Sequence, residues 1–395
     1  MNVIYLTTYP PRKCGIAIFA ADLIEALIAR NGPGSTRVIA ISDVAEYLYG
    51  PEVIAEISQT TRQDYVKAAL LVNESGADLV HIQHEYGIFG GKFGSYLLDF
   101  LANVKKPVVV TLHTVQINPE REIVNVLREI ARFSRVLIVM AEKARESLAK
   151  VYGIDPKKVT VIPHGVPNMR PMRREVLKSK YDLSGRKVIS TLGLINPGKG
   201  IEYAIQALPA VVRKHPDVVY LVIGQTHPVV QRQMGETYRV SLYEMVGRLG
   251  LQDHVRFIDE FLTKDKLLEY LALTDIYLTP YISKEQITSG TLAYAVALGK
   301  AIVSTPYFYA EEMLAGGRGL LADFKDPGSI AGCILEILDT PGKQRELERK
   351  TRAFGRNMSW PSVAKLHEIL FQNIMDKKVP LGTAAATVAA ATILE

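Results

Sequence analysis

The sequence is poor in cysteine and tryptophan: its 395 residues include two cysteines, Cys14 and Cys333, and a single tryptophan. Two cysteines exclude a disulfide scaffold or a cysteine-based zinc site, and they fit a reducing compartment. No run of about 18 apolar residues occurs, and the first residues lack the pattern of a signal peptide. We therefore expect neither a spanning helix nor a leader, and a cytoplasmic location.

The excess of positive charge is also small. The net charge is +6, from 47 Lys and Arg against 41 Asp and Glu. This surplus suits anionic ligands or the inner face of a membrane, but it does not by itself predict nucleic-acid binding. The hydrophobic fraction of 48% is ordinary for a globular protein and excludes disorder as a description of the whole chain. The length predicts roughly two domains.

Short apolar runs rich in Val and Ile alternate with helical segments, which is typical of parallel strands buried on both faces. We expect strands at Val3–Thr8, Arg37–Ser42, Leu79–Gln83, Val108–His113, Val136–Ala141, Lys187–Leu192, Val218–Gly224, Val255–Ile258, Asp275–Pro280 and Ala301–Ser304. We expect helices at Ile16–Arg30, Gly200–Lys214, Gln231–Leu249, Lys264–Leu273, Thr288–Leu298 and Pro361–Met375. Two such series in tandem predict two doubly wound α/β domains.

Prolines and a glycine cluster at residues 163–172, which we interpret as the linker between the domains. We predict a first domain at 1–165, a second at 166–358 and a helical segment at 359–378. The tail, 379–395, is rich in Ala and Thr and nearly uncharged. A weak helix, a disordered end and an added sequence remain open for it.

Glycines and polar residues follow several of the expected strands. Ligands of open parallel sheets bind beyond the carboxyl ends of the strands, so these turns are candidate sites. Lys199 lies in a Gly-rich turn before one expected helix. Ser289 and Gly290 precede another, where free N–H groups could hold an anion. Neither turn is a Walker loop or G-x-G-x-x-G, so tight turns with a solvated lysine are an equal alternative.

His113 is the candidate catalytic residue of the first domain, because it ends a buried strand where little else is polar. A core histidine bonded to backbone is the competing interpretation. His84, Glu85 and Tyr86 follow the neighbouring strand and are candidate acceptor-side residues, although Glu85 could equally be a solvated loop residue. His81 and His84 would lie on opposite faces of a strand, so we expect no shared metal site.

Eight segments carry a family resemblance. They are TTYPPRKCGIAIF, DLVHIQHEYGIFGG, VVVTLHT, VTVIPHGV, GLINPGKG, VRFIDEFL, TDIYLTPY and EQITSGTLAYAVALGKAIVSTPYFYAEE. In these segments, which occur in order along both halves, the chain resembles retaining glycosyltransferases of family 4 (group 1), especially the mannosyltransferase-like branch. The resemblance implies the GT-B fold: two Rossmann-like domains with a cleft between them. It also implies an acceptor mainly on the first domain, a nucleotide sugar mainly on the second, and a C-terminal helix that crosses back to the first.

The resemblance further implies roles for single residues. Lys199 matches a lysine that contacts the donor phosphates, Gly15 a glycine that closes onto the diphosphate, and His113 a histidine near the transferred sugar. The implied donor-binding set is Gly15, Lys199, Phe257, Ile258, Gln286, Ser289, Gly290, Thr291 and Tyr294. The implied catalytic set is His113, Lys199, Glu285 and Gln286.

Three positions depart from the family pattern. Leu194 stands where most relatives have an arginine that contacts phosphate. Tyr294 and Gln286 stand where most have glutamates for the ribose and for the sugar hydroxyls. Gln286 or its neighbour Glu285 could still contact the sugar, and Arg12 or Lys13 could replace the missing phosphate contact, which is worth about 1.5–3 kcal/mol.

The activity that the resemblance implies is transfer of mannose from GDP-mannose to a hydroxyl acceptor, with retention and without a metal or other cofactor. We expect a carbohydrate or lipid-linked acceptor, and with the latter, peripheral attachment to a membrane. No nucleic-acid partner is expected. A glucosyltransferase that uses UDP- or ADP-glucose and a catalytically silent protein that binds sugar nucleotides are the alternatives.

Overall fold

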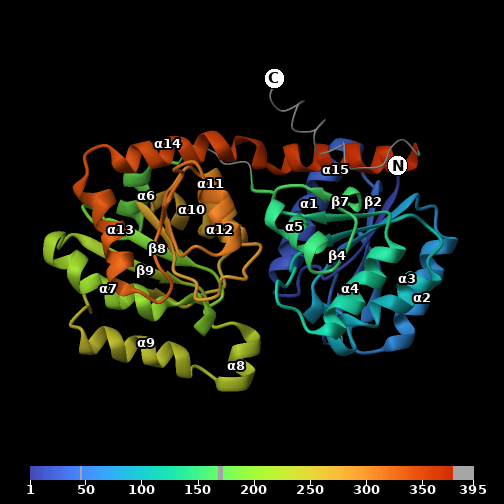
Figure 1. Cartoon of the computed structure of the whole chain (residues 1–395), viewed down its shortest axis with the longest axis horizontal. Helices are drawn as coiled ribbons and strands as arrows, with labels where there is room; N and C mark the ends of the chain where they lie inside the picture. Colours follow the sequence, from blue (N-terminus) through green and yellow to red (C-terminus); the bar gives the residue numbers. More distant parts are fainter. Residues whose placement is uncertain (45–46, 168–171, 377–395) are drawn as a thin grey trace. The chain divides into compact units, whose positions relative to one another are not determined.

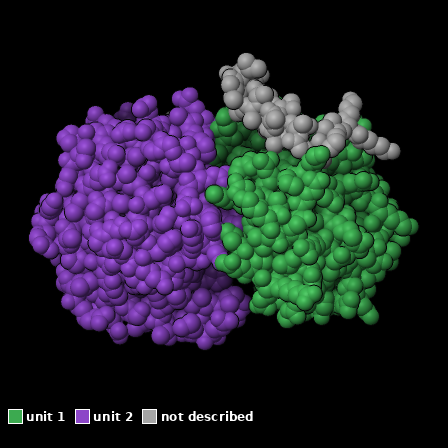
Figure 2. Space-filling view, viewed as in Figure 1, with its two compact units in different colours: residues 1–167, 357–395 green, residues 168–356 purple. Residues whose placement is uncertain are grey.

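The computed structural model describes residues 1–44, 47–167 and 172–376. The chain forms two compact units (Figure 2). Unit 1 comprises residues 1–167 and 357–395, and unit 2 comprises residues 168–356. Part of the expected linker, 168–171, and the whole of the tail at 379–395 lie outside the described residues.

Unit 1 is built on a parallel sheet of seven strands in the order β3-β2-β1-β4-β5-β6-β7. The strands are β1 (Val3–Thr7), β2 (Thr36–Ser42), β3 (Val53–Ser58), β4 (Leu79–His84), β5 (Val108–Leu112), β6 (Val136–Val139) and β7 (Val159–Val161). All residues of β1, β4, β5 and β6 are buried, which explains their continuous apolar runs. The strand order reverses between β1 and β4, and in such sheets ligands bind at the carboxyl ends of the strands at that point.

The helices of unit 1 include one from the end of the described chain. They are α1 (Gly15–Asn31), α2 (Arg62–Glu74), α3 (Leu97–Asn103), α4 (Arg121–Phe133), α5 (Glu142–Lys150) and α15 (Trp360–Met375). Ser359 caps α15 through its side chain, and Pro361 stands in the first turn, where its missing N–H has no cost.

Helix α15 packs beside α1 on one face of the sheet of unit 1 (Figure 1). Trp360, Val363 and Phe371 join the core formed by the sheet and α1, and the Trp360 indole N–H donates to Asp22 at 3.1 Å. Burial of a large apolar side chain contributes about 1.5–3 kcal/mol, so these contacts alone hold the helix on unit 1. The chain therefore leaves unit 1, forms unit 2 and returns.

Unit 2 is a second parallel sheet, with six strands in the order β10-β9-β8-β11-β12-β13. The strands are β8 (Lys187–Leu192), β9 (Val218–Ile223), β10 (Val255–Ile258), β11 (Ile276–Thr279), β12 (Ala301–Ser304) and β13 (Leu320–Leu321). Its helices are α6 (Arg174–Lys180), α7 (Ile201–Lys214), α8 (Pro228–Met234), α9 (Thr237–Arg248), α10 (Lys264–Leu273), α11 (Gly290–Ala297), α12 (Phe308–Leu314), α13 (Pro327–Asp339) and α14 (Lys343–Gly355). The prediction of two doubly wound parallel sheets is confirmed, and the order of unit 2 reverses between β8 and β11.

One expected helix was wrong in detail. The segment predicted as a single helix, Gln231–Leu249, forms the end of α8 and the whole of α9. Gly235 separates them with φ +62° and ψ −141°, a conformation that favours glycine and breaks the helix. No helix in the described parts of the chain has both the length and the apolarity needed to cross a bilayer.

Candidate functional site

In unit 2 the turn after β8 places Lys199 beside the backbone of the sheet edge. Gly193 directly follows β8 with φ +119°, and a Cβ on it would lie 3.4 Å from Lys199 Nζ and 3.7 Å from the Thr291 methyl group. Gly200 follows Lys199 with φ +63°, and a Cβ there would come within 2.1 Å of the Pro280 carbonyl oxygen. Gly200 is therefore required for the close approach of this turn to the loop after β11, whereas the backbone conformation of Gly193 favours glycine through its positive φ.

The ammonium group of Lys199 donates to the Tyr281 hydroxyl at 2.5 Å. Burial alone would raise the pKa of the Tyr281 phenol, but Lys199, together with hydrogen bonds from Ser289 and Thr291, outweighs burial and lowers this pKa. The Tyr281 ring stacks on Tyr307, with centroids 5.0 Å apart and planes at 16°. Lys199 is thus held in place by an aromatic hydroxyl, and within residues 1–44, 47–167 and 172–376 no acidic side chain forms an ion pair with it.

Helix α11 begins beside this lysine. The Ser289 side chain is the N-cap and accepts from the Leu292 N–H at 3.4 Å, while Gly290 and Thr291 form the first turn. A helix start carries unpaired N–H groups and a partial positive charge. The structure therefore brings together four of the predicted residues: Lys199, Ser289, Gly290 and Thr291.

The other predicted donor residues of unit 2 lie around this cluster. The Gln286 side-chain amide donates to the Thr288 carbonyl at 2.7 Å, and Glu285 is exposed in the same loop. Tyr294 lies one turn into α11 and is half-buried. Phe257 and Ile258 end β10, which two strands separate from β11, and the Ile258 carbonyl accepts from the Gly224 N–H at 2.9 Å. A ligand that contacts Phe257 or Ile258 as well as Lys199 would have to extend across the end of β9, which lies between β10 and β8.

Two residues near Lys199 were missed as site residues. Tyr281 lies in the loop after β11 and His227 in the turn after β9, and neither is among the predicted site residues. The His227 N–H donates to the Ile195 carbonyl at 2.8 Å, which ties the two turns together. Burial, then Lys199 and Arg232, lower the pKa of His227. The position of a polar residue in the turn after a parallel strand was the available signal for both.

In unit 1, Gly15 begins α1 and is exposed, with open space where a Cβ would stand. Arg12, three residues earlier, is not free to bind a phosphate in this structure. Its guanidinium donates to the Ile41 carbonyl at 3.0 Å and to Gln59 Oε1 at 2.9 Å, and it lies 3.5 Å from Asp43. We therefore find Arg12 engaged in holding its own loop.

His113 follows β5 and takes part in a chain of polar contacts. Its Nε2 lies 2.8 Å from Gln83 Oε1, and the Gln83 amide lies 3.3 Å from His81 Nε2, which is 2.7 Å from the Thr111 hydroxyl. Because an amide oxygen only accepts, His113 Nε2 carries the proton. Burial, followed by His164 and His84, lowers the pKa of His113 to about 3. The imidazole is therefore neutral at physiological pH.

The expected acceptor-side residues lie deeper than the sequence suggested. His84 is fully buried and stacks on Phe89 at 5.7 Å and 17°, and the Tyr86 ring meets it edge-on. Glu85 is half-buried and accepts from the Tyr86 N–H at 2.9 Å and from the Thr114 hydroxyl. Burial raises the pKa of the Glu85 carboxyl, although both hydrogen bonds oppose the rise. Of the three, Glu85 is the least enclosed.

His81 and His84 contact different surroundings, as their spacing predicts. His81 faces His367 and Phe371 of α15, with ring centroids 5.5 Å and 5.4 Å away, whereas His84 faces Phe89. Across residues 1–44, 47–167 and 172–376, no group of three or more His, Cys, Asp and Glu side chains is arranged to hold a metal ion. The polar chemistry of the two units is therefore a positively charged turn in unit 2 and a neutral histidine in unit 1.

Two family models match the chain, one on each unit. The model described as "Glycosyltransferase Family 4" matches residues 15–170, and the one described as "Glycosyl transferases group 1" matches residues 173–354. A solved structure, Anabaena HepE in complex with UDP-glucose, superposes with a TM-score of 0.73 at 17% identity, and the match covers 94% of this chain and 100% of that one. At this identity the likeness establishes the fold only.

Three named relatives match parts of the chain at 25–27% identity. Spore coat protein SA of Bacillus subtilis (strain 168) is 27% identical over 229 residues, 56% of this chain and 58% of that protein. D-inositol 3-phosphate glycosyltransferase of Corynebacterium glutamicum (strain R) is 25% identical over 311 residues, 73% and 70% of the two chains. GDP-mannose-dependent alpha-(1-6)-phosphatidylinositol monomannoside mannosyltransferase of Mycolicibacterium smegmatis is 25% identical over 225 residues, 54% and 56%.

The chain thus spans between 56% and 70% of the length of these three relatives. The two family models divide the chain between them, because one covers nearly all of the first sheet and the other covers the second. With a family 4 domain in unit 1 and a group 1 domain in unit 2, the chain belongs to the glycosyltransferases of the GT-B fold.

Proposed function

We propose that the protein is a retaining glycosyltransferase that transfers a sugar, mannose from GDP-mannose, to a hydroxyl group of a carbohydrate or lipid-linked acceptor. The observation that carries the proposal is the cluster at the carboxyl edge of unit 2, where Lys199 Nζ lies beside Gly193, Tyr281 and the start of α11. A lysine without an ion-pair partner next to a helix N-terminus is a suitable site for a diphosphate.

The leaving group of such a transfer is a nucleoside diphosphate, which gains negative charge as the bond from the anomeric carbon to the phosphate oxygen breaks. Lys199 and the N–H groups of Gly290 and Thr291 would stabilise that charge at positions fixed before the reaction. Arg232 adds a positive charge to the same surroundings, because its charge, like that of Lys199, lowers the pKa of the neutral His227. We assign the largest share of catalysis to this electrostatic stabilisation.

The acceptor oxygen then bonds to the anomeric carbon on the face that the phosphate leaves, and its proton passes to the departing phosphate oxygen. His113 does not supply a proton in this scheme, because it is neutral and its Nε2–H is bonded to Gln83. Its role is to orient the sugar through neutral hydrogen bonding or through its backbone carbonyl. No metal takes part in the scheme, and the sequence contains no Asp-x-Asp pair.

The choice of mannose rests on the mannosyltransferase-like motifs and on a relative that is named as GDP-mannose-dependent. A glucosyl donor is the rival, because a protein of the same fold binds UDP-glucose. The test is release of nucleotide from GDP-mannose, UDP-glucose, UDP-GlcNAc and ADP-glucose, with sugar and lipid acceptors and with EDTA present. Turnover of GDP-mannose supports the proposal, turnover of UDP- or ADP-glucose alone replaces mannose by glucose, and neither binding nor turnover across the panel refutes it.

The role of Lys199 is tested by Lys199→Ala with Lys187→Ala as the matched control. Lys187 is an exposed lysine at the opposite, amino end of the same region of the sheet, on β8. Loss of one charge-assisted contact of about 1.5–3 kcal/mol predicts a roughly 10- to 150-fold weaker affinity of Lys199→Ala for GDP, measured by calorimetry. Equal affinity of the two variants would remove Lys199 from the donor site.

A silent protein that binds sugar nucleotides is the second candidate. It is favoured by Leu194 and Tyr294 at positions where most family members have Arg and Glu, and by a relative named as a spore coat protein. Nucleotide binding without hydrolysis or transfer of any donor would support this candidate against the enzyme.

A further inference from the structure

A pocket of about 370 Å³ lies at the edge of the sheet of unit 1 that is opposite to His113. It is lined by Lys105, Lys106, Pro107, Val108, Arg132, Phe133, Ser134, Arg135 and Lys158. These residues precede or begin β5, β6 and β7, so the pocket lies at the amino ends of the strands. The five residues of β5 separate Pro107 from His113 by a strand length of about 17 Å. The pocket is therefore distinct from the candidate site.

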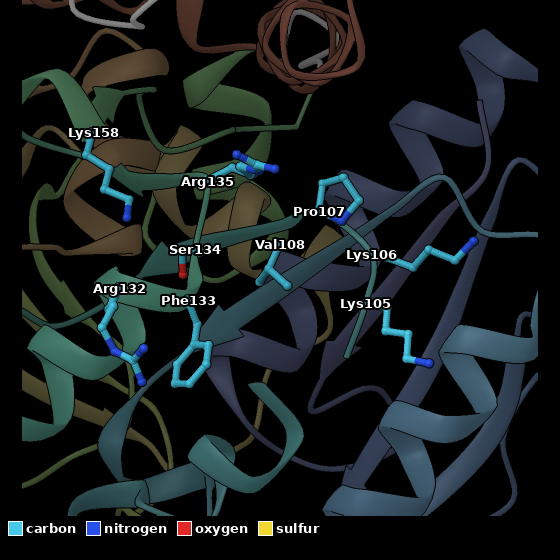
Figure 3. Close-up of a pocket in the computed structure, with 9 residues that line it drawn as sticks. All are labelled: Lys105, Lys106, Pro107, Val108, Arg132, Phe133, Ser134, Arg135 and Lys158. Atoms are coloured by element: carbon cyan, nitrogen blue, oxygen red, sulfur yellow. The ribbon is translucent and has the colours of Figure 1, made fainter. Parts of the chain in front are cut away.

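Five of the nine lining residues are basic and none is acidic. Figure 3 shows Lys158 and Arg132 on one side of Val108, and Lys105 and Lys106 on the other. Such a group of like charges around one hollow is unfavourable unless water or an anion compensates it.

Most of these charges have no acidic partner. Among the described residues, the side chains of Lys105, Lys106, Arg135 and Lys158 make no ion pair or hydrogen bond. Lys158 is half-buried, and burial, followed by the nearby charge of Arg135, lowers the pKa of its ammonium group. An anion bound between Lys158 and Arg135 would offset the lowering of the Lys158 pKa that the Arg135 charge causes.

Arg132 differs from the other four because it is already oriented. Its guanidinium is 4.1 Å from the Phe133 ring centroid and 2.8 Å from Glu129, one turn back on α4. A planar guanidinium held in this way can offer its remaining N–H groups to phosphate oxygens in a fixed direction. The pocket thus combines a preoriented arginine with four uncompensated cations.

We propose that this basic pocket, formed by Lys105, Lys106, Arg132, Arg135 and Lys158, binds a phosphate-bearing ligand with at least two negative charges. Ligand pockets are typically about 300–1,000 Å³, so the volume suits a diphosphate or a phosphorylated headgroup rather than a large substrate. The same chemistry is offered by a free phosphate compound and by the headgroup of an anionic phospholipid. The inference does not depend on the proposed function.

The test uses inorganic pyrophosphate and phospholipid vesicles as probes for the full chain. Calorimetric titration with pyrophosphate compares the wild type, Arg135→Ala/Lys158→Ala, and the control Arg121→Ala/Lys67→Ala, which removes the same charge from exposed positions of unit 1. Lys199→Ala, assayed in parallel, reports pyrophosphate bound in unit 2. We expect the pocket variant to lose binding at one site by more than about tenfold, with the control and Lys199→Ala retaining it.

Sedimentation with phosphatidylcholine vesicles, with and without phosphatidylglycerol, identifies the source of the phosphate. Binding of the wild type to the phosphatidylglycerol vesicles, with loss in the pocket variant, assigns a lipid headgroup; pyrophosphate binding without vesicle binding assigns a free compound. Single Arg135→Gln and Lys158→Gln variants, with melting temperatures like that of the wild type, guard against loss of folding. Equal affinity of pocket and control variants for both probes, or no binding of either probe by the wild type, overturns the proposal.

Discussion

Acidification should unfold unit 1 before it affects unit 2. Five of the eight histidines are in unit 1, and burial is the main cause that lowers the pKa of each: His84 and His113 to about 3, His164 and His367 to about 4, and His81 well below its usual value. The unfolded chain titrates near 6.5, so it binds more protons than the folded chain between about pH 4 and pH 6.5. Stability therefore falls as pH falls through this window.

The magnitude is worked from three of the four buried histidines, His84, His164 and His367, whose lowered pKa values are about 3 and about 4. A pH of 5.5 is one unit below the pKa of these histidines in the unfolded chain but above their pKa in the folded chain. Relative to pH 7.5, each histidine therefore lowers the free energy of unfolding by about 1.4 kcal/mol, or about 4 kcal/mol together. With a urea m-value of about 2 kcal/mol/M, the midpoint of unit 1 should fall by about 2 M between pH 7.5 and pH 5.5.

The assay uses Trp360, the single tryptophan, which is buried in unit 1 against Phe19 and therefore reports unfolding of that unit. Circular dichroism follows both units. His84→Phe is the matched variant, because both ring nitrogens of His84 lack partners and its ring stacks on Phe89. This variant should lose the contribution of one histidine, about 1.4 kcal/mol of the pH effect. A tryptophan midpoint that is the same at both pH values, or a pH effect unchanged in His84→Phe, would refute the reasoning.

Three further outcomes follow from single contacts. Gly200→Ala should weaken GDP binding by more than about tenfold in calorimetry, because its Cβ would meet the Pro280 carbonyl oxygen at 2.1 Å; equal affinity contradicts the required close approach. Trp360→Phe should lower the free energy of unfolding by about 1–3 kcal/mol in urea melts followed by circular dichroism, because Asp22 loses a buried donor; an unchanged midpoint contradicts this. The pH profile of kcat/KM should show no limb near pH 6.5 from His113, and a limb there that His113→Asn abolishes would contradict its neutral state.

The parts of the fold that could be predicted are the buried strands, because their residues are continuously apolar. Continuous apolar runs such as Val108–Leu112 predicted central parallel strands because both faces of these strands are covered. The edge strand Val53–Ser58 was not expected, because it alternates exposed and covered residues and contains a glutamate. Val159–Val161 was also missed, since three residues are too short for a pattern. The break at Gly235 depends on a backbone conformation that a single glycine permits but does not require.

The site residues that could be predicted are those whose position depends on the order of strands and helices. Lys199 and Gly290 lie at helix starts that follow strands, so the alternation of strand and helix brought them to one sheet edge. The partnership of Lys199 with Tyr281 could not be predicted, because it joins side chains 82 positions apart across two loops. The same holds for Arg12, whose partners Ile41 and Gln59 lie on other strands and their loops.

The departures from the family pattern can be weighed against these contacts. Leu194 removes a cation from the turn that holds Lys199, but the loop after β9 is tied to the same turn through the His227 N–H and the Ile195 carbonyl. That loop leads into α8, whose Arg232 is close enough to lower the pKa of His227 together with Lys199. Under the proposed function, a positive charge near the donor phosphates therefore does not require an arginine at position 194. A diphosphate leaving group requires nearby positive charge whichever residue provides it. The loop that carries the positively charged residue can therefore differ between proteins of the same fold.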